Sequence, residues 1–122
     1  MRRLLSALAV LILLVPVAPA ASKGKVHNVE ASGGPASYLF TWDPDELTIP
    51  KGHKVVWANP TNVLHHVTFY EGMEQSMHLE SGKKVKTRFK KAGTYLYRCD
   101  VPYHSELIGG ECFGMCGSVT VE

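Results

Sequence analysis

Short runs of alternating apolar and polar residues follow one another along most of the chain, and residues that favour turns separate them. A period of two places successive side chains on opposite faces of a strand, so these runs predict β-strands. The predicted strands are residues 26–30, 38–42, 46–49, 54–59, 66–70, 83–90, 93–98 and 117–122. Residues 72–80 fit the pattern least, and we expect a loop or one helical turn there.

Residues 83–90 show the clearest alternation. Val85, Thr87 and Phe89 alternate with lysine or arginine at positions 84, 86, 88 and 90. Such a strand buries one face, and its row of charges suits an exposed edge that must not pair with other chains. About eight short strands in ~100 residues are typical of an antiparallel Greek-key sandwich. The sequence therefore predicts an all-β Greek-key β-sandwich of seven or eight strands.

The first twenty residues have the pattern of a secretory signal peptide. Arg2 and Arg3 precede an apolar run at residues 4–15, and small residues for cleavage stand at positions 18–20. The apolar run is twelve residues long, whereas a membrane-spanning helix needs about 20. We therefore expect cleavage after residue 20, a mature domain of residues 21–122 without a membrane span, and export to the periplasm or the extracellular face.

Length, composition and charge exclude several classes of protein. The chain has 122 residues, of which 45% are hydrophobic and 20% are charged, with thirteen Lys and Arg against eleven Asp and Glu. This composition excludes a disordered tail, a membrane bundle and a multidomain enzyme. The two arginines of the predicted leader account for the positive excess, so the mature domain is neutral. No basic stripe with interleaved aromatic residues indicates a nucleic-acid partner.

Residues that bind metals gather at the ends of predicted strands. His65 precedes one strand and Cys99 follows another, with His104 and Met115 further along the same loop. A thiolate, two imidazoles and a weak thioether form the ligand set of a mononuclear copper site that transfers electrons. The chain lacks the closely spaced Cys and His pairs of a structural zinc site. A cysteine nucleophile beside His104 is disfavoured, because so small a domain leaves little room for a substrate cleft.

In these residues the chain resembles the cupredoxins, the small blue copper proteins that include plastocyanin, azurin and auracyanin. The resemblance covers residues 40–122 approximately, and its segments are 45–52, 56–59, 65–68, 92–99, 99–104 and 114–121. It implies one copper ion per chain, held by His65, Cys99 and His104 with Met115 as the weak axial ligand. It also implies that the amide of His66 donates a hydrogen bond to the Cys99 sulfur, and that the protein is not an enzyme.

The loop between His104 and Met115 departs from the family pattern. Ten residues lie between the two, more than in the loops that it resembles. If Met115 is not axial, a backbone carbonyl or a three-coordinate copper is the alternative. The chain has three cysteines, so at most two can pair. Because an exported chain permits oxidation, we expect a disulfide between Cys112 and Cys116, which would stiffen this loop.

We therefore predict an exported type 1 copper protein that shuttles single electrons between larger redox proteins. The alternatives are a module that stores or delivers copper without redox turnover, and a metal-free structural sandwich. Partners would dock transiently near His104, and the protein is expected to be a monomer. The apolar patch proposed for docking consists of Leu64, Pro102, Tyr103, Leu107 and Ile108.

Five further residues have side chains that can bind metals but lie outside the motifs of the candidate copper site. We expect His27, His53 and His78 to lie at the surface. Met73 and Met77, together with His78, either pack in the core or a loop or form a soft docking cluster for Cu(I).

Overall fold

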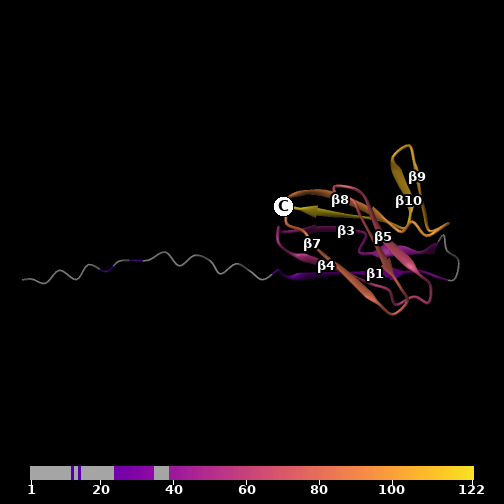
Figure 1. Cartoon of the computed structure of the whole chain (residues 1–122), viewed down its shortest axis with the longest axis horizontal. Coiled ribbons are helices and arrows are strands. Elements are labelled where there is room, and N and C mark those ends of the chain that lie inside the picture. Colours follow the sequence, from indigo (N-terminus) through magenta and orange to yellow (C-terminus); the bar gives the residue numbers. More distant parts are fainter. Residues whose placement is uncertain (1–11, 13, 15–23, 35–38) are drawn as a thin grey trace, which may run out of the picture.

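Two β-sheets face each other in the computed structural model, which describes residues 12, 14, 24–34 and 39–122 (Figure 1). The predicted signal peptide lies outside the described residues, apart from Ile12 and Leu14, and it stays a prediction. Among the described segments, none forms a helix with the length and apolar character that a membrane crossing requires.

The first sheet has the order β2-β1-β4-β7, and the second has the order β3-β11-β8-β5-β6. The first sheet comprises β1 (Val26–Ser32), β2 (Thr41–Asp43), β4 (Lys54–Ala58) and β7 (Lys84–Arg88). The second comprises β3 (Glu46–Ile49), β5 (His65–Glu71), β6 (Gln75–Leu79), β8 (Gly93–Arg98) and β11 (Cys116–Val121). A separate hairpin, β9 (Ser105–Ile108) and β10 (Glu111–Gly114), projects from the end of the sandwich opposite the C-terminus (Figure 1).

The predicted all-β sandwich is confirmed, but its strand count and pairing differ from the prediction. The described residues form eleven strands rather than seven or eight. Two neighbouring pairs, β1 with β4 and β3 with β11, are parallel. Parallel neighbours need a crossover connection, and here the chain visits the opposite sheet between the two members of each pair. A local sequence pattern does not encode such a crossover, so the sheets are mixed rather than purely antiparallel.

The core lies between the inward faces of the two sheets, and aromatic rings fill its centre. The ring centroids of Trp57 and Tyr97 are 5.3 Å apart, and those of Phe69 and Tyr97 are 5.6 Å apart. Trp42 lies 5.7 Å from Tyr97 and 6.1 Å from the ring of His65. Tilted and edge-on contacts of this kind add to the hydrophobic burial of the rings. The packed core therefore continues up to the first histidine of the candidate metal site.

Residues 72–80 do not form the predicted loop or helical turn. Residues Gln75–Leu79 are strand β6, which pairs with β5 so that Leu79 lies opposite His65. Only Met77 and Leu79 of this strand face the core. Two apolar positions are too few to show the alternation of apolar and polar residues that identifies a strand. Met73 also packs against the core, which is one of the two roles considered for these methionines.

The surface position predicted for His53 is wrong, whereas His78 is exposed as predicted. His53 is 9% exposed because the turn before β4 brings it to the same face of the sheet as Val55 and Trp57. His27 is half-buried and contacts His53.

Candidate metal centre

The structure brings the three strong predicted ligands together at one end of the core. His65 is the first residue of β5, Cys99 directly follows β8, and His104 directly precedes β9. One nitrogen or sulfur atom from each of the three lies within 4.8 Å of the others, and all three side chains are buried. Residues far apart in sequence meet here because β5 and β8 are neighbours in the second sheet.

The three ligand atoms form a triangle that fits one metal ion. The distance from His65 Nδ1 to His104 Nδ1 is 3.2 Å, and Cys99 Sγ lies 3.8 Å and 3.3 Å from these two nitrogens. An ion in the plane of this triangle would lie about 2 Å from each atom, close to metal–nitrogen and metal–thiolate bond lengths in proteins. Two imidazoles and a thiolate suit copper in both of its oxidation states.

Hydrogen bonds fix the ring of His65 before any metal binds. Thr61 Oγ1 contacts His65 Nε2 at 2.9 Å, which leaves Nδ1 to face the other ligands. The Asn59 side chain accepts hydrogen bonds from the backbone and hydroxyl of Thr61 and donates to the carbonyl of Leu79 at 2.9 Å. Such outer contacts orient a metal-binding imidazole. Burial, reinforced by His104 and then His66, lowers the pKa of His65 to about 4, so the ring is neutral near pH 7.

A backbone hydrogen bond reaches the sulfur of Cys99, as the family resemblance implied. The N–H of His66 donates to Cys99 Sγ at 3.3 Å. Burial raises the pKa of the Cys99 thiol, and the backbone N–H groups of His66 and Val101 act in the opposite direction. Because the thiolate is the metal-binding form, a bound ion must displace this proton.

Met115 lies beside the triangle, between β10 and β11. Its side chain is fully buried, its N–H donates to the carbonyl of His104 at 2.9 Å, and its carbonyl accepts from the N–H of Cys99 at 3.0 Å. These two hydrogen bonds hold the backbone of Met115 next to both neighbouring ligands. The long insertion after His104 therefore returns the chain to the site at Met115.

Sequence reasoning missed the aromatic wall of the site. Phe40 is buried, with its ring centroid 4.8 Å from that of His65 and 5.0 Å from that of His104. The alternation at residues 38–42 could have indicated an inward-facing Phe40, but nothing in that segment pointed to the metal. The ring of Phe40 therefore packs against both histidine rings.

The insertion between His104 and Met115 is the β9–β10 hairpin, and its base is closed. Ser105 pairs with Gly114, and Leu107 pairs with Cys112. Gly114 has φ 99°, and a Cβ atom there would lie 2.5 Å from the carbonyl oxygen of His104. Glycine is therefore required where the hairpin rejoins the site.

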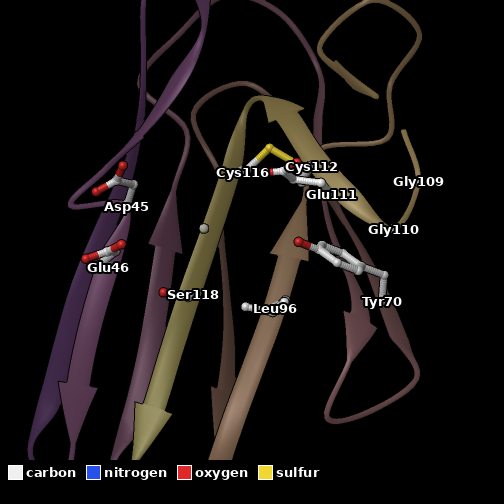
Figure 2. Close-up of a pocket in the computed structure, with 11 residues that line it drawn as sticks. Asp45, Glu46, Tyr70, Leu96, Gly109, Gly110, Glu111, Cys112, Cys116 and Ser118 are labelled. Carbon is white, nitrogen blue, oxygen red and sulfur yellow. A yellow bond between two sulfur atoms is a disulfide. The ribbon is translucent and has the colours of Figure 1, made fainter. Parts of the chain in front are cut away.

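The predicted disulfide is present and ties the hairpin to the second sheet. Cys112 in β10 bonds to Cys116 in β11 with a Cα–Cα distance of 6.1 Å, while Cys99 remains free. Figure 2 shows this disulfide above Tyr70 and Leu96, and both of its cysteines line a cavity of about 590 Å³. The cavity lies between the hairpin and the outer face of the second sheet, and none of the four predicted copper ligands lines it.

A buried Cys–His–His triangle beside a buried methionine, at the end of a two-sheet sandwich, defines a mononuclear copper protein of the cupredoxin class. Comparison with known proteins agrees. The profile of the copper binding proteins of the plastocyanin/azurin family matches residues 27–122, and the chain belongs to this family. The chain is 26% identical over 106 residues to plastocyanin from Scenedesmus fuscus, covering 78% of this chain and 100% of that one.

Solved structures share the fold. A purple cupredoxin from Nitrosopumilus maritimus superimposes with a TM-score of 0.60 and 24% identity, covering 78% of this chain and 98% of that one. A reduced variant of amicyanin gives a TM-score of 0.57 and 25% identity, covering 78% of this chain and 80% of that one.

Family membership confirms the predictions of the cofactor, of a protein that is not an enzyme and, in general terms, of transient redox partners. The cofactor is a single type 1 copper, at the site formed by His65, Cys99, His104 and Met115. Plastocyanin and amicyanin are electron carriers, and a protein of this family is not an enzyme. Transient redox partners follow from the same membership.

Proposed function

We propose that this protein is an exported carrier of single electrons. His65, Cys99 and His104 would hold the copper ion, and Met115 would be its weaker fourth ligand. The observation that carries the proposal is the convergence of His65 Nδ1, Cys99 Sγ and His104 Nδ1 within 3.2–3.8 Å of one another. Bound copper supplies the chemistry by cycling between Cu(I) and Cu(II).

The rigidity of the ligands favours electron transfer. Thr61 holds the ring of His65, the N–H of His66 holds the sulfur of Cys99, and two backbone hydrogen bonds hold Met115. Side chains fixed independently of the metal move little when an electron arrives or leaves. The same burial keeps water and competing ligands out, which favours retention of copper over its delivery to another protein.

The surface next to His104 offers a route for the electron. His104 is 6% exposed, so a small part of its ring reaches the surface, and the neighbouring Tyr103 is 82% exposed. Leu64, Leu107 and Ile108 are exposed, as expected for the proposed docking patch. A patch of a few exposed apolar side chains suits a transient complex with a modest interface. We infer that a monomer docks its redox partners here.

The disulfide supports the proposed export. Disulfides persist in oxidising compartments and are rare in the cytosol. The Cys112–Cys116 bond therefore agrees with a periplasmic or extracellular location and with removal of residues 1–20 as a signal peptide.

The proposal is tested by adding Cu(II) to the purified domain of residues 21–122. We expect intense visible absorption from thiolate-to-copper charge transfer, a reversible one-electron wave in cyclic voltammetry, and slow loss of copper to a chelator. Cys99→Ser should abolish the absorption, while the Cys112→Ser, Cys116→Ser double variant retains it. Absence of the absorption contradicts the site, whereas copper that is lost rapidly to the chelator and gives no reversible wave indicates storage or delivery.

A further inference from the structure

The side-chain amide of Asn59 has different partners at its two ends. Its Nδ2 group donates to the carbonyl oxygens of Val63 and Leu79, at 2.7 Å and 2.9 Å. Its Oδ1 atom accepts from the backbone N–H of Thr61 at 3.0 Å. A carbonyl oxygen only accepts and a backbone N–H only donates, so the amide cannot turn around without losing all three hydrogen bonds. Asn59 is 1% exposed, so water does not replace these partners.

The fixed amide decides where the hydroxyl hydrogen of Thr61 points. Thr61 Oγ1 lies 2.6 Å from Asn59 Oδ1, and two oxygens approach this closely when a hydrogen lies between them. Because Oδ1 has no hydrogen of its own, Thr61 is the donor. The other oxygen nearby, the carbonyl of Val63 at 3.3 Å, also only accepts. In either case the single hydroxyl hydrogen is used, and Thr61 Oγ1 can only accept from a further partner.

That further partner is the ring of His65, whose Nε2 lies 2.9 Å from Thr61 Oγ1. The ring is neutral near pH 7, because burial above all lowers its pKa to about 4. With Thr61 Oγ1 as the acceptor, Nε2 must carry the one ring hydrogen, and the lone pair of the neutral ring is then on Nδ1. Nδ1 is the atom that faces Cys99 Sγ and His104 Nδ1.

We propose that Asn59, acting through Thr61, sets the tautomer of His65 and thereby selects Nδ1 as its copper-binding atom. The hydrogen bonds run in one direction, from His65 Nε2–H to Thr61 Oγ1 and from Thr61 Oγ1–H to Asn59 Oδ1. Neither Asn59 nor Thr61 is a copper ligand, so both are positioning residues. An acceptor at Nε2 also makes the imidazole more basic, and a more basic ligand binds Cu(II) more strongly.

The second histidine ligand has no such series of hydrogen bonds. Within the described part of the chain, the ring of His104 makes its hydrogen-bond contacts through Nδ1, to His65 Nδ1 at 3.2 Å and to Cys99 Sγ at 3.3 Å. Two lone pairs facing each other at 3.2 Å would repel. Since His65 presents its lone pair there, His104 must carry its hydrogen on Nδ1 in the metal-free protein. To bind copper, His104 releases this hydrogen to water as a proton and takes up another at Nε2, whereas His65 needs no change.

NMR tests the proposal on the metal-free protein, in which no ion imposes a tautomer. Long-range ¹H–¹⁵N spectra of ¹⁵N-labelled protein at neutral pH show which nitrogen of each ring carries the hydrogen. We expect Nε2–H for His65 and Nδ1–H for His104. A hydrogen on Nδ1 of His65 in wild type overturns the proposal. Because the measurement uses no copper, its result is independent of the visible absorption that tests the proposed function.

Thr61→Val removes the acceptor with little change in shape. We expect the copper-loaded variant to bind Cu(II) about tenfold more weakly, as is typical when an outer contact of a metal ligand is lost. With Cu(I) binding unchanged, a tenfold loss raises the reduction potential by about 59 mV. Cyclic voltammetry and competition with a chelator measure the two effects.

Two matched variants separate positioning from a general effect on the fold. Thr61→Ser keeps the hydroxyl and should retain the wild-type potential. Ser81→Ala removes the hydrogen bond to the main-chain carbonyl of Thr61 but leaves its side chain intact, so it should also retain this potential. A potential that is equal in Thr61→Val and wild type, or that shifts equally in Thr61→Val and Thr61→Ser, contradicts the proposal.

Discussion

The main-chain N–H of His66 donates a hydrogen bond to the sulfur of Cys99 across 3.3 Å, which links the start of β5 to the residue after β8. The side chain of His66 is held in turn, because its Nδ1 lies 2.6 Å from a carboxylate oxygen of Asp100. His66 directly follows the copper ligand His65 in sequence, and Asp100 directly follows the copper ligand Cys99. One pair of contacts therefore fixes the spacing of His65 and Cys99 and places a dipole against the sulfur, where it stabilises negative charge.

Stability of the metal-free protein should depend on pH through His65. Its native pKa of about 4 lies below the ordinary value of 6.5, so between these limits the unfolded chain binds more protons than the native one. The free energy of unfolding should fall as the pH is lowered, by about 2 kcal/mol from this group between pH 7 and pH 4.5. Urea unfolding of the apoprotein at several pH values measures this change in the free energy of unfolding. His65→Gln should give a shallower dependence, and equal slopes would rule out this origin.

Loss of the disulfide should destabilise the domain without removing copper. The bond closes a ring of residues 112–116, and a ring of this size restricts the unfolded chain by about 2 kcal/mol. The Cys112→Ser, Cys116→Ser double variant should therefore unfold at a lower urea concentration, with its visible absorption retained. Thiol titration of unfolded, unreduced apoprotein should detect one free thiol, from Cys99. Three thiols in wild type would contradict the pairing.

Met115→Leu should keep the intense absorption, because His65, Cys99 and His104 are unchanged, and should raise the reduction potential. A thioether stabilises Cu(II) weakly, and an apolar side chain of similar size does not. Cyclic voltammetry compares the variant with wild type and with Met73→Leu, which alters a methionine packed against the core. An unchanged potential in Met115→Leu would count against axial ligation by Met115.

An acidic residue in the docking patch should slow electron exchange between copies of the protein. Leu107 is 41% exposed, and Leu107→Asp places like charges opposite each other when two patches meet. We expect the self-exchange rate, measured by NMR line broadening, to fall about tenfold with no loss of colour. Val26→Asp is the control, because Val26 is an exposed apolar residue in β1. Equal rates in Leu107→Asp and wild type would exclude this patch.

Gly117→Ala should destabilise the domain by overpacking. Gly117 lies opposite Tyr97 in the β11–β8 pair, and an added Cβ would stand 2.2 Å from the Tyr97 ring. Tyr97 is fully buried against Trp57 and cannot move away freely. The expected cost is about 1–3 kcal/mol in urea unfolding. Ser118→Ala, at the next position and on the other face, should change stability by less than about 0.5 kcal/mol.

The sequence was most informative where residue chemistry is unusual. His65, Cys99 and His104 could be selected because their types and spacing match a metal site, and the structure brings all three together. Strand patterns were reliable where alternation was long, as at residues 83–90, which contain edge strand β7. The signal peptide and the location remain predictions.

What the sequence could not supply was mainly non-local. The parallel pairing of β1 with β4 depends on a crossover that local alternation does not record. The place of Phe40 against both histidines depends on how the sheets stack. By contrast, Gly109-Gly110 is a hairpin signal that the interpretation overlooked, and both glycines have positive φ in the turn between β9 and β10.

Because the base of the β9–β10 hairpin is closed, a change in the hairpin need not change the metal site. The segment leaves the site at His104 and returns at Met115 through adjoining, hydrogen-bonded backbones. Any insert that ends in the same pair could replace it without displacing a ligand. Recognition of partners and tuning of the metal can thus be altered independently, by evolution or by grafting another hairpin onto the same frame.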